Sequence, residues 1–572
     1  MLPPWWWYDY IEEKEEVIMK KLLKKSLALS LAMVMVLSLG ACTKDKEEAS
    51  NGGGSTETKV ETNVGGDETT PAPAEEEKDY SEHYTYSYAS IQITESTDYN
   101  SPDDAMTQYW EQKYNFDWDI ISISSDKWDS TVNTWAYAED LPDVTIFDYK
   151  HPQMMDWVDQ GLVFKFPKGW QERWPNVARV QEYGGLQLAF EDITGDTYFL
   201  ARPNYANNLP CTPGINPTNM MVYIRKDWAE AVGIEIKDYY TIDEIMEYAR
   251  RVKEQDPGHV GKDLIPMGLS SGNCYNVFVS TCSTYTSNNY YLYRDGSDFK
   301  WGLADEETLE GLKLWRQAFD EGLLNKEFYS YSGSEDVEDF YVRGVSGLMW
   351  YQGGARYQQD VANRMKDNLG LNYDDVVKQI FITANDGTYH SAPRGNFWGV
   401  IMFNPDIPIE KWERYMDMLD ESCSEEGQIL IRMGFEGVDW EMKDGEMVSL
   451  LEEGKDARSK YPSIYPVYHQ LCMLSDDFVL INPNYPKEYR DLTIKMYKLK
   501  EELGKNGGCP PIDYDIYLYS SDATAALSFE YDKDFANIVV NKGDVETEWK
   551  AWLDSWAYLM DPVLAELKAN IK

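Results

Sequence analysis

Cysteine is scarce in this chain, and the spacing of its cysteines argues against a zinc site. The 572 residues contain seven cysteines, none of them in a C-x-x-C pair. Structural zinc sites use closely spaced thiolate and imidazole ligands, so this spacing disfavours zinc. Besides Cys42, six cysteines remain whose pairing in disulfides the sequence leaves open: Cys211, Cys274, Cys282, Cys423, Cys472 and Cys509.

The motifs of nucleotide and metal chemistry are also absent. The sequence holds no P-loop, no G-x-G-x-x-G, no H-E-x-x-H and no EF-hand loop. We therefore expect no cofactor and predict no metal ligand. Scattered carboxylates leave calcium binding open.

Basic residues are few relative to acidic ones. Lys and Arg number 53 against 99 Asp and Glu, which gives a net charge of −46. Because binding to phosphate backbones depends on Lys and Arg, nucleic acid is not an expected partner. The acidity itself indicates a soluble surface.

An apolar run near the N-terminus is typical of a secretory signal. Lysines at positions 20, 21, 24 and 25 precede residues 26–41, which are almost wholly apolar or small. The run is shorter than the roughly 20 residues of a spanning helix, and charged residues follow it at once. A membrane span is therefore the weaker interpretation.

Leu39-Gly40-Ala41-Cys42 resembles the lipobox of bacterial lipoproteins. In that motif the cysteine is lipidated and holds the protein on the membrane surface. We expect translation to start at Met19, a signal peptide over 19–41, and residues 1–18 outside the mature protein. The alternative is an ordinary secretory signal with an incidental cysteine at position 42.

Residues 43–79 have the composition of a tether. They contain no aromatic residue and are rich in Gly, Ser, Thr, Glu, Lys and Pro. A flexible chain of this length spans roughly 33 Å. The body that starts at Tyr80 has about 490 residues, more than one hydrophobic core usually serves, so two lobes are expected.

The first part of the body predicts an α/β lobe. Residues 86–94 and 116–123 have the composition of strands, and 101–115 predicts a helix with Ser101 as N-cap. Parallel strands need a crossover of this kind, so the two strands are expected to be parallel neighbours. A helix at 129–138 and a strand at 143–148 continue the pattern.

Two later segments predict amphipathic helices of the second lobe. Residues 241–258 open with a capping box, Thr241 and Glu244, and end at a Pro-Gly pair. Residues 305–324 repeat apolar side chains at the helical period.

Five segments carry a family resemblance: "EDLPDVTIFD" (139–148), "MVYIRKDWAEAVGIE" (221–235), "GLKLWRQAFDEGLLNKEF" (311–328), "VSGLMWYQGGARY" (345–357) and "RMGFEGVDWEMKDG" (432–445). In this order they resemble the extracellular solute-binding proteins of carbohydrate ABC importers (family 1), in particular the large lipoproteins of that group. The likeness covers most of residues 83–570. Two features depart from the family: the aromatic content is high, and "YNSPDD" shows no clear ligand-binding pattern.

The resemblance implies an α/β fold of the type II periplasmic-binding-protein kind. Two lobes, each a mixed sheet flanked by helices, would be joined by hinge crossings and close around a ligand. The first crossing would lie near 197–205 and the return near 379–400. The implied division is lobe 1 at 80–202 and 381–450, lobe 2 at 203–380, and C-terminal helices across both at 451–572.

In such proteins the ligand contacts come from strand ends and crossings, where crevices also form on physical grounds. Aromatic residues make up 14% of the chain. Most must be core, but some would stack on sugar rings while polar side chains bond to hydroxyls. Each candidate has an alternative role in a core, a salt bridge or a helix cap. The resemblance implies these ligand-binding residues: Asp148, Tyr149, Arg202, Tyr205, Trp350, Tyr351, Arg394, Asn396, Trp398, Glu436 and Trp440.

Catalysis is the competing class of function. "GLSSG" (268–272) matches the nucleophile elbow around Ser270, with His390 or His469 as a later base, but "GNCYNVF" is a poor helix start. A glycosidase needs two carboxylates at a set separation in space. The positions of the acidic residues in the sequence do not single out such a pair.

The sequence thus predicts a non-enzymatic, monomeric receptor anchored by lipid to the extracellular face of the bacterial cell membrane. It would capture an oligosaccharide between its lobes and deliver it to the transmembrane subunits of an ABC permease. The alternatives are a secreted glycan-hydrolysing lipoprotein, or a peptide receptor of the same fold that uses Arg202 or Arg394 for the peptide termini.

Overall fold

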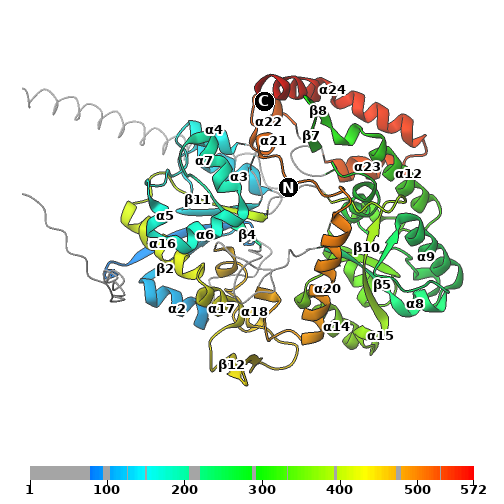
Figure 1. Cartoon of the computed structure of the whole chain (residues 1–572), viewed down its shortest axis with the longest axis horizontal. Helices are drawn as coiled ribbons and strands as arrows, with labels where there is room; N and C mark the ends of the chain where they lie inside the picture. The colour runs from blue at the N-terminus through cyan, green and yellow to red at the C-terminus, as the bar shows by residue number, and fades with distance from the viewer. Residues whose placement is uncertain are drawn as a thin grey trace, which may run out of the picture. The chain divides into compact units, whose positions relative to one another are not determined.

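Residues 78–572 of the computed structural model contain two mixed β-sheets, each flanked by helices (Figure 1). Cys42, the expected signal peptide and nearly all of the tether lie outside the described residues. So do Tyr149, Tyr205 and Arg394. The structure describes residues 78–93, 104–124, 127–148, 151, 153–204, 220–286, 291–331, 333–391, 396–471, 478–527 and 530–571.

The first sheet has five strands in the order β2-β1-β3-β11-β4. β1 pairs in parallel with β2 and β3, and β11 runs antiparallel to β3 and β4. The expected parallel pair is confirmed, with α2 (Ala105–Tyr114) between its strands. The strands are β1 (Tyr84–Ser90), β2 (Phe116–Ile121), β3 (Val144–Asp148), β4 (Leu200–Pro203) and β11 (Phe397–Phe403).

α2 begins later than the sequence suggested. Its N-cap is Asp104, whose carboxylate accepts hydrogen bonds from the backbone N–H groups of Met106 and Thr107. Asp104 thus satisfies two of the free donors at the helix start, and the prediction of Ser101 as N-cap is wrong.

Alternate side chains of the first sheet enter two separate cores. In β11, Ile401 and Phe403 belong to one core, and Val400 and Met402 belong to the other. This alternation is expected of a strand covered on both faces. Helices α2, α6, α16 and α17 contribute to the first core, and α3, α4 and α7 to the second. The helices are α3 (Trp128–Tyr137), α4 (Met154–Asp159), α5 (Trp170–Arg173), α6 (Pro175–Gly184), α7 (Leu186–Thr194), α16 (Ile409–Ser422), α17 (Glu425–Met433) and α18 (Ala457–Lys460).

The second sheet has four strands in the order β6-β10-β5-β9. β10 runs antiparallel to β5 and parallel to β6, and β5 runs antiparallel to β9. The chain passes from the second sheet back to the first between β10 and β11. The strands are β5 (Met220–Arg225), β6 (Tyr239–Thr241), β9 (Leu348–Gln352) and β10 (Val377–Thr383).

Helices also pack on both faces of the second sheet. α8, α9 and α12 share one core with it, and α13, α14 and α20 share the other. The predicted capping box is confirmed, since Thr241 and Glu244 each accept a hydrogen bond from the other's backbone N–H. The helices are α8 (Lys226–Ala231), α9 (Ile242–Gln255), α10 (Ser271–Cys274), α11 (Ser280–Cys282), α12 (Glu306–Asp320), α13 (Ser334–Val342), α14 (Ala355–Leu369) and α15 (Tyr373–Val376).

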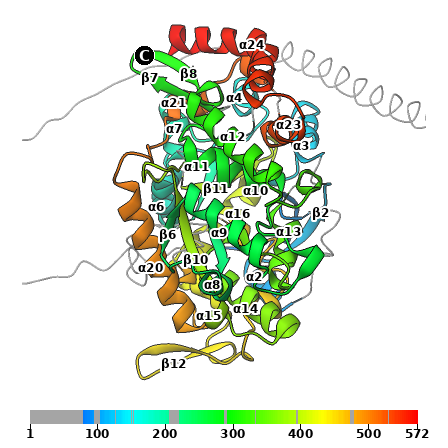
Figure 2. The same cartoon turned by 90° about the vertical axis from the view of Figure 1, so that its right-hand side faces the viewer.

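The C-terminal helices reach the cores of both sheets. Ile516 of α21 belongs to a core of the second sheet, whereas Tyr517 and Leu518 belong to a core of the first. α24 lies beside the β7–β8 hairpin and α12 (Figures 1 and 2). These elements are β7 (Leu292–Asp295), β8 (Asp298–Trp301), α20 (Lys487–Gly504), α21 (Tyr514–Leu518), α22 (Asp522–Ala525), α23 (Tyr531–Val540) and α24 (Val545–Asn570).

A second hairpin, β12 (Trp440–Lys443) with β13 (Glu446–Ser449), precedes α18. Among the residues described, no helix combines the length and the apolar character that crossing a membrane would require.

Candidate functional site

Arg202 and Trp398 form a stacked pair on neighbouring strands of the first sheet. The guanidinium carbon of Arg202 lies 3.6 Å from the centre of the Trp398 ring. The register of β4 against β11 shifts between Phe397 and Gly399, so Trp398 is the extra residue of a β-bulge. Gly399 leaves room for the guanidinium, because a Cβ there would lie 3.1 Å from Nη1 of Arg202. Bulge and glycine together hold the indole against the cation.

Arg202 continues into a hydrogen-bonded chain of side chains. It is 2% exposed, and its guanidinium donates to Oε1 of Gln470. Gln470 in turn donates to the carbonyl oxygen of Tyr465, with an N–O distance of 2.7 Å. The neighbouring His469 is buried, with its Nε2 2.6 Å from Nη1 of Arg432 on α17.

Arg458 on α18 lies against the ring of Tyr465. Its guanidinium carbon is 3.9 Å from the ring centre. Tyr465 is 37% exposed, so this contact reaches the protein surface. Within the described part of the chain, Arg458 forms no ion pair with a carboxylate.

Arg356 approaches the same region from the second sheet. It lies in the first turn of α14, and its Nε is 3.5 Å from Oδ2 of Asp456. Asp456 is the N-cap of α18 and also accepts hydrogen bonds from the Tyr485 hydroxyl and the Ser459 backbone N–H. A helix of the second sheet therefore contacts a helix of the first through this ion pair.

Four arginines, which we call the arginine cluster, act on one buried histidine. The pKa of His469 is held well below its usual range, first by burial and then by the positive charges of the cluster. Burial also lowers the pKa of Arg458, and the nearby charge of Arg356 adds to that effect. In a chain of net charge −46, this region concentrates positive charge. The cluster consists of Arg202, Arg356, Arg432 and Arg458.

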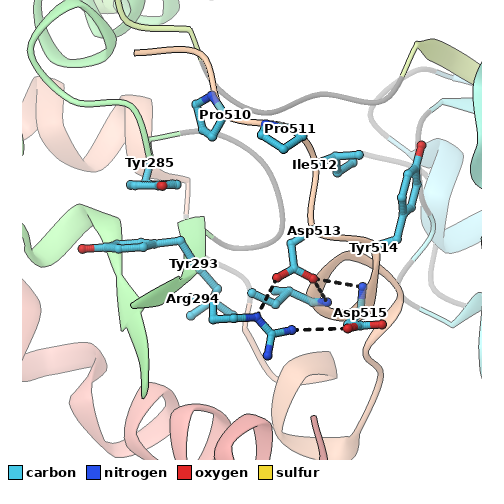
Figure 3. Close-up of a pocket in the computed structure, with 11 residues that line it drawn as sticks. Tyr285, Tyr293, Arg294, Pro510, Pro511, Ile512, Asp513, Tyr514 and Asp515 are labelled. Carbon is cyan, nitrogen blue, oxygen red and sulfur yellow. Dashed lines mark hydrogen bonds and ion pairs between the residues drawn. The ribbon is translucent and has the colours of Figure 1, made fainter. Parts of the chain in front are cut away.

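A cavity of about 450 Å³ lies beside the segment that leads into α21 (Figure 3). The rings of Tyr285 and Tyr293 stack on one side of it, with centroids 3.8 Å apart and planes 6° from parallel. Arg294 of β7 donates to Asp513, the N-cap of α21, and to Asp515 at 3.1 and 3.3 Å. Aromatic faces with a few oriented polar groups suit a small polar ligand.

Of the eleven predicted ligand residues, the structure brings Arg202 and Trp398 together. Asn396 lies two residues before Trp398 and donates to the carbonyl oxygen of Tyr183 at 3.2 Å. Asp148 pairs with Gly399 through the β3–β11 register, but its side chain lies outside the described residues, like Tyr149, Tyr205 and Arg394.

The remaining predicted residues occupy other places. Tyr351 is buried in one core of the second sheet, and Trp350 packs against the other. Trp440 is buried and donates from its indole nitrogen to the carbonyl oxygen of Gly434 at 3.0 Å, while Glu436 is exposed. These contacts give Trp350, Tyr351 and Trp440 a packing role, and their contact with a ligand stays a prediction.

Sequence reasoning missed most of the arginine cluster. Arg356 lies within the segment 345–357, and Arg458 stands in "EEGKDARSKYP" (452–462), which holds three basic and three acidic residues. No local excess of positive charge therefore marks Arg458. Arg432 is the first residue of the segment 432–445.

Ser270 acts as a helix cap. Its hydroxyl accepts a hydrogen bond from the backbone N–H of Asn273 at 3.2 Å, and the residue is fully buried. α10 does begin at Ser271, so the expectation of a poor helix start is wrong. His390 instead contacts Oγ1 of Thr284 at 2.6 Å, and His469 lies in the arginine cluster.

In the portion of the chain that the structure describes, no group of three or more His, Cys, Asp or Glu side chains could hold a metal ion. The cysteines described there, Cys274, Cys282, Cys423 and Cys509, are free thiols. Cys211 and Cys472 lie outside the described residues.

No family model matches this chain. Lipoprotein LipO of Bacillus subtilis strain 168 is 28% identical over 244 residues, which are 41% of this chain and 46% of that protein. The polygalacturonan/rhamnogalacturonan-binding protein YtcQ of the same strain is 23% identical over 344 residues, 59% of this chain and 64% of that protein. The chain thus matches about half to two thirds of the length of these curated relatives.

The structure of an EF-hand mutant of the ABC-transporter substrate-binding protein FusA of Streptococcus pneumoniae, in complex with fructo-nystose, is similar to this one. It superposes with a TM-score of 0.60 at 17% identity, covering 85% of this chain and 98% of that chain. The fold is therefore that of the type II extracellular solute-binding proteins, as the sequence predicted. FusA, an ABC-transporter substrate-binding protein, and LipO, a lipoprotein, are of the kinds that the sequence resemblance named.

Proposed function

We propose that this protein is an extracellular receptor that binds an oligosaccharide between its two sheets and delivers it to an ABC permease. The stacked Arg202–Trp398 pair carries the proposal, because it presents a half-buried aromatic face beside a fixed cation where β11 begins. The fold supports it, since FusA is named a substrate-binding protein and holds a sugar, and YtcQ is named a polysaccharide-binding protein.

The geometry suggests how the receptor recognises its ligand. The face of Trp398 stacks on the apolar face of a sugar ring, while the buried Arg202 holds the indole in place from the other side. A ligand that contacts both lobes stabilises their closed arrangement only to the extent that it binds the closed arrangement more tightly than the open one. Affinity then depends on the contacts that the ligand makes with both lobes.

The proposal includes lipid anchoring. Cys42, lipidated at the start of the mature chain, would hold the protein at the extracellular membrane face. Residues 43–79 would form a flexible tether that separates the folded part of the protein from the membrane. The permease and its ATPase would be separate chains.

Thermal unfolding of residues 78–572 with a panel of oligosaccharides and short peptides tests the receptor function. A ligand at 100 times its dissociation constant adds roughly 2.7 kcal/mol to the free energy of unfolding, which raises Tm visibly. The proposal expects at least one sugar to raise Tm and to be recovered unchanged. A sugar recovered in shortened form, or a panel in which only peptides raise Tm, overturns it.

A further inference from the structure

We infer that the ligand is an anionic oligosaccharide whose acid groups are held by Arg356 and Arg458. This inference rests on the proposed receptor function and specifies the class of ligand. It is carried by the placement of two arginines, one on a helix of each sheet: Arg356 is 32% exposed and contacts Asp456, the N-cap of the helix that carries Arg458.

Arg458 has donors to offer. Its guanidinium carbon is set against the Tyr465 ring at 3.9 Å, and no carboxylate among the described residues pairs with it. A guanidinium carries five N–H donors in a planar fork, which matches a carboxylate or a sulfate through two parallel hydrogen bonds. Tyr465, 37% exposed, adds an aromatic surface beside that fork.

Arg356 is only partly satisfied by protein groups. Its contact with Asp456 is made through Nε at 3.5 Å, and its side chain is 32% exposed. The carboxylate of Asp456 already accepts hydrogen bonds from Tyr485 and Ser459. The Arg356 guanidinium therefore retains capacity for a second anion.

The rest of the molecule makes this arrangement unusual. Some arginines elsewhere pair closely with carboxylates, as Arg250 does with Glu321 and Arg173 with Glu413, whereas others, such as Arg179 and Arg414, donate to backbone carbonyl oxygens. Here Arg356 and Arg458 lie close enough for one charge to lower the pKa of the other. Gathering like charges costs free energy, and an anion bound between them would offset that cost.

The two arginines also belong to different lobes. Arg356 lies on α14, which shares a core with the second sheet, and Arg458 lies on α18, whose Ala457 belongs to a core of the first. An anionic group between them makes contacts from both sides. Charge recognition and lobe closure would then be coupled.

The test compares an acidic sugar with its neutral ester and adds a sulfated sugar. Titration calorimetry of residues 78–572 would use tri-galacturonate, its fully methyl-esterified form, and a sulfated trisaccharide. Variants R458Q and R356Q each remove one guanidinium group. R458K keeps the positive charge but lacks the planar guanidinium that can form two parallel hydrogen bonds. R343Q is the matched control, because Arg343 is exposed and pairs with Asp339 on α13.

We expect one of the two acidic sugars to bind at least tenfold more tightly than the neutral ester. The sugar that does so shows whether the site prefers a carboxylate or a sulfate group. R458Q and R356Q should weaken acidic-sugar binding by roughly ten- to a hundredfold. R458K should restore part of the loss, and R343Q should change nothing.

Equal binding of ester and acid, unchanged in R458Q and R356Q, overturns the inference and leaves the receptor function standing. Tighter binding of an acidic peptide than of any sugar overturns both. If R458Q does not fold, R356Q and R458K replace it. For these variants the same quantity is measured, the affinity for the acidic sugar divided by the affinity for its neutral ester.

Discussion

The carboxylate of Asp456 has two roles at once: it lies 3.5 Å from Nε of Arg356 and it caps α18. Asparagine is an equally good N-cap but carries no charge. Asp456→Asn should therefore keep the helix and remove an anion that competes with the ligand. We expect its affinity for an acidic oligosaccharide to rise about two- to fivefold, in line with a partly exposed ion pair. Titration calorimetry measures this, and weaker binding by the variant would count against the assignment of Arg356.

Trp398 should matter more for binding than for stability. It is half-buried and stacks on Arg202, so Trp398→Ala removes a ligand surface without opening a core. The expected loss of binding free energy is about 1 to 3 kcal/mol. Trp315→Ala is the contrasting control, because Trp315 is fully buried and its loss should lower Tm. If Trp398→Ala loses stability and keeps its affinity, the residue belongs to the core.

Local signals in the sequence predicted local structure well. The capping box at Thr241 formed as expected, since both partners lie within one helical turn. The parallel pairing of β1 with β2 followed from the helix between them. The start of α2 was missed because two capping residues, Ser101 and Asp104, compete within one turn and local chemistry does not rank them.

The site was harder to predict, because its contacts join distant parts of the chain. Arg202 meets Gln470 across 268 residues, and no local pattern encodes that contact. The family resemblance placed Trp350 and Tyr351 in a small-residue turn, but both lie on β9, where successive side chains point to opposite faces of the sheet and reach two different cores. The bulge that presents Trp398 depends on a register shift that only the paired strands define.

His469 should make stability depend on pH. Its folded-state pKa lies well below the value of about 6.5 expected in the unfolded chain. Below pH 6.5 the unfolded state therefore binds a proton that the folded state does not, so stability falls as pH falls. The contribution should reach up to about 1.4 kcal/mol per pH unit.

Denaturant unfolding at pH 7, 6 and 5 checks this, with His469→Gln as the comparison. The difference in unfolding free energy between variant and wild type should shift in favour of the variant as the pH is lowered. A difference that stays constant with pH would show that the pKa of His469 is the same in the folded and unfolded protein, and would contradict this prediction.

Cys42 should determine where the protein resides in the cell. If it carries the lipid, Cys42→Ser will move the protein from the membrane fraction to the medium in a Gram-positive host. Mass spectrometry of the wild-type N-terminal peptide should show a lipid-modified cysteine at position 42. An unmodified Cys42, with the protein still bound to the membrane, would require a different anchor.

The central claim is that this chain binds a sugar and returns it unchanged. The most direct measurement is equilibrium dialysis of residues 78–572 against an oligosaccharide identified by its effect on Tm, followed by chromatography of the recovered sugar. The account predicts retention of sugar on the protein side, loss of that retention in Trp398→Ala, and a recovered sugar of the original length. Absence of retention, or shortened products, would contradict it.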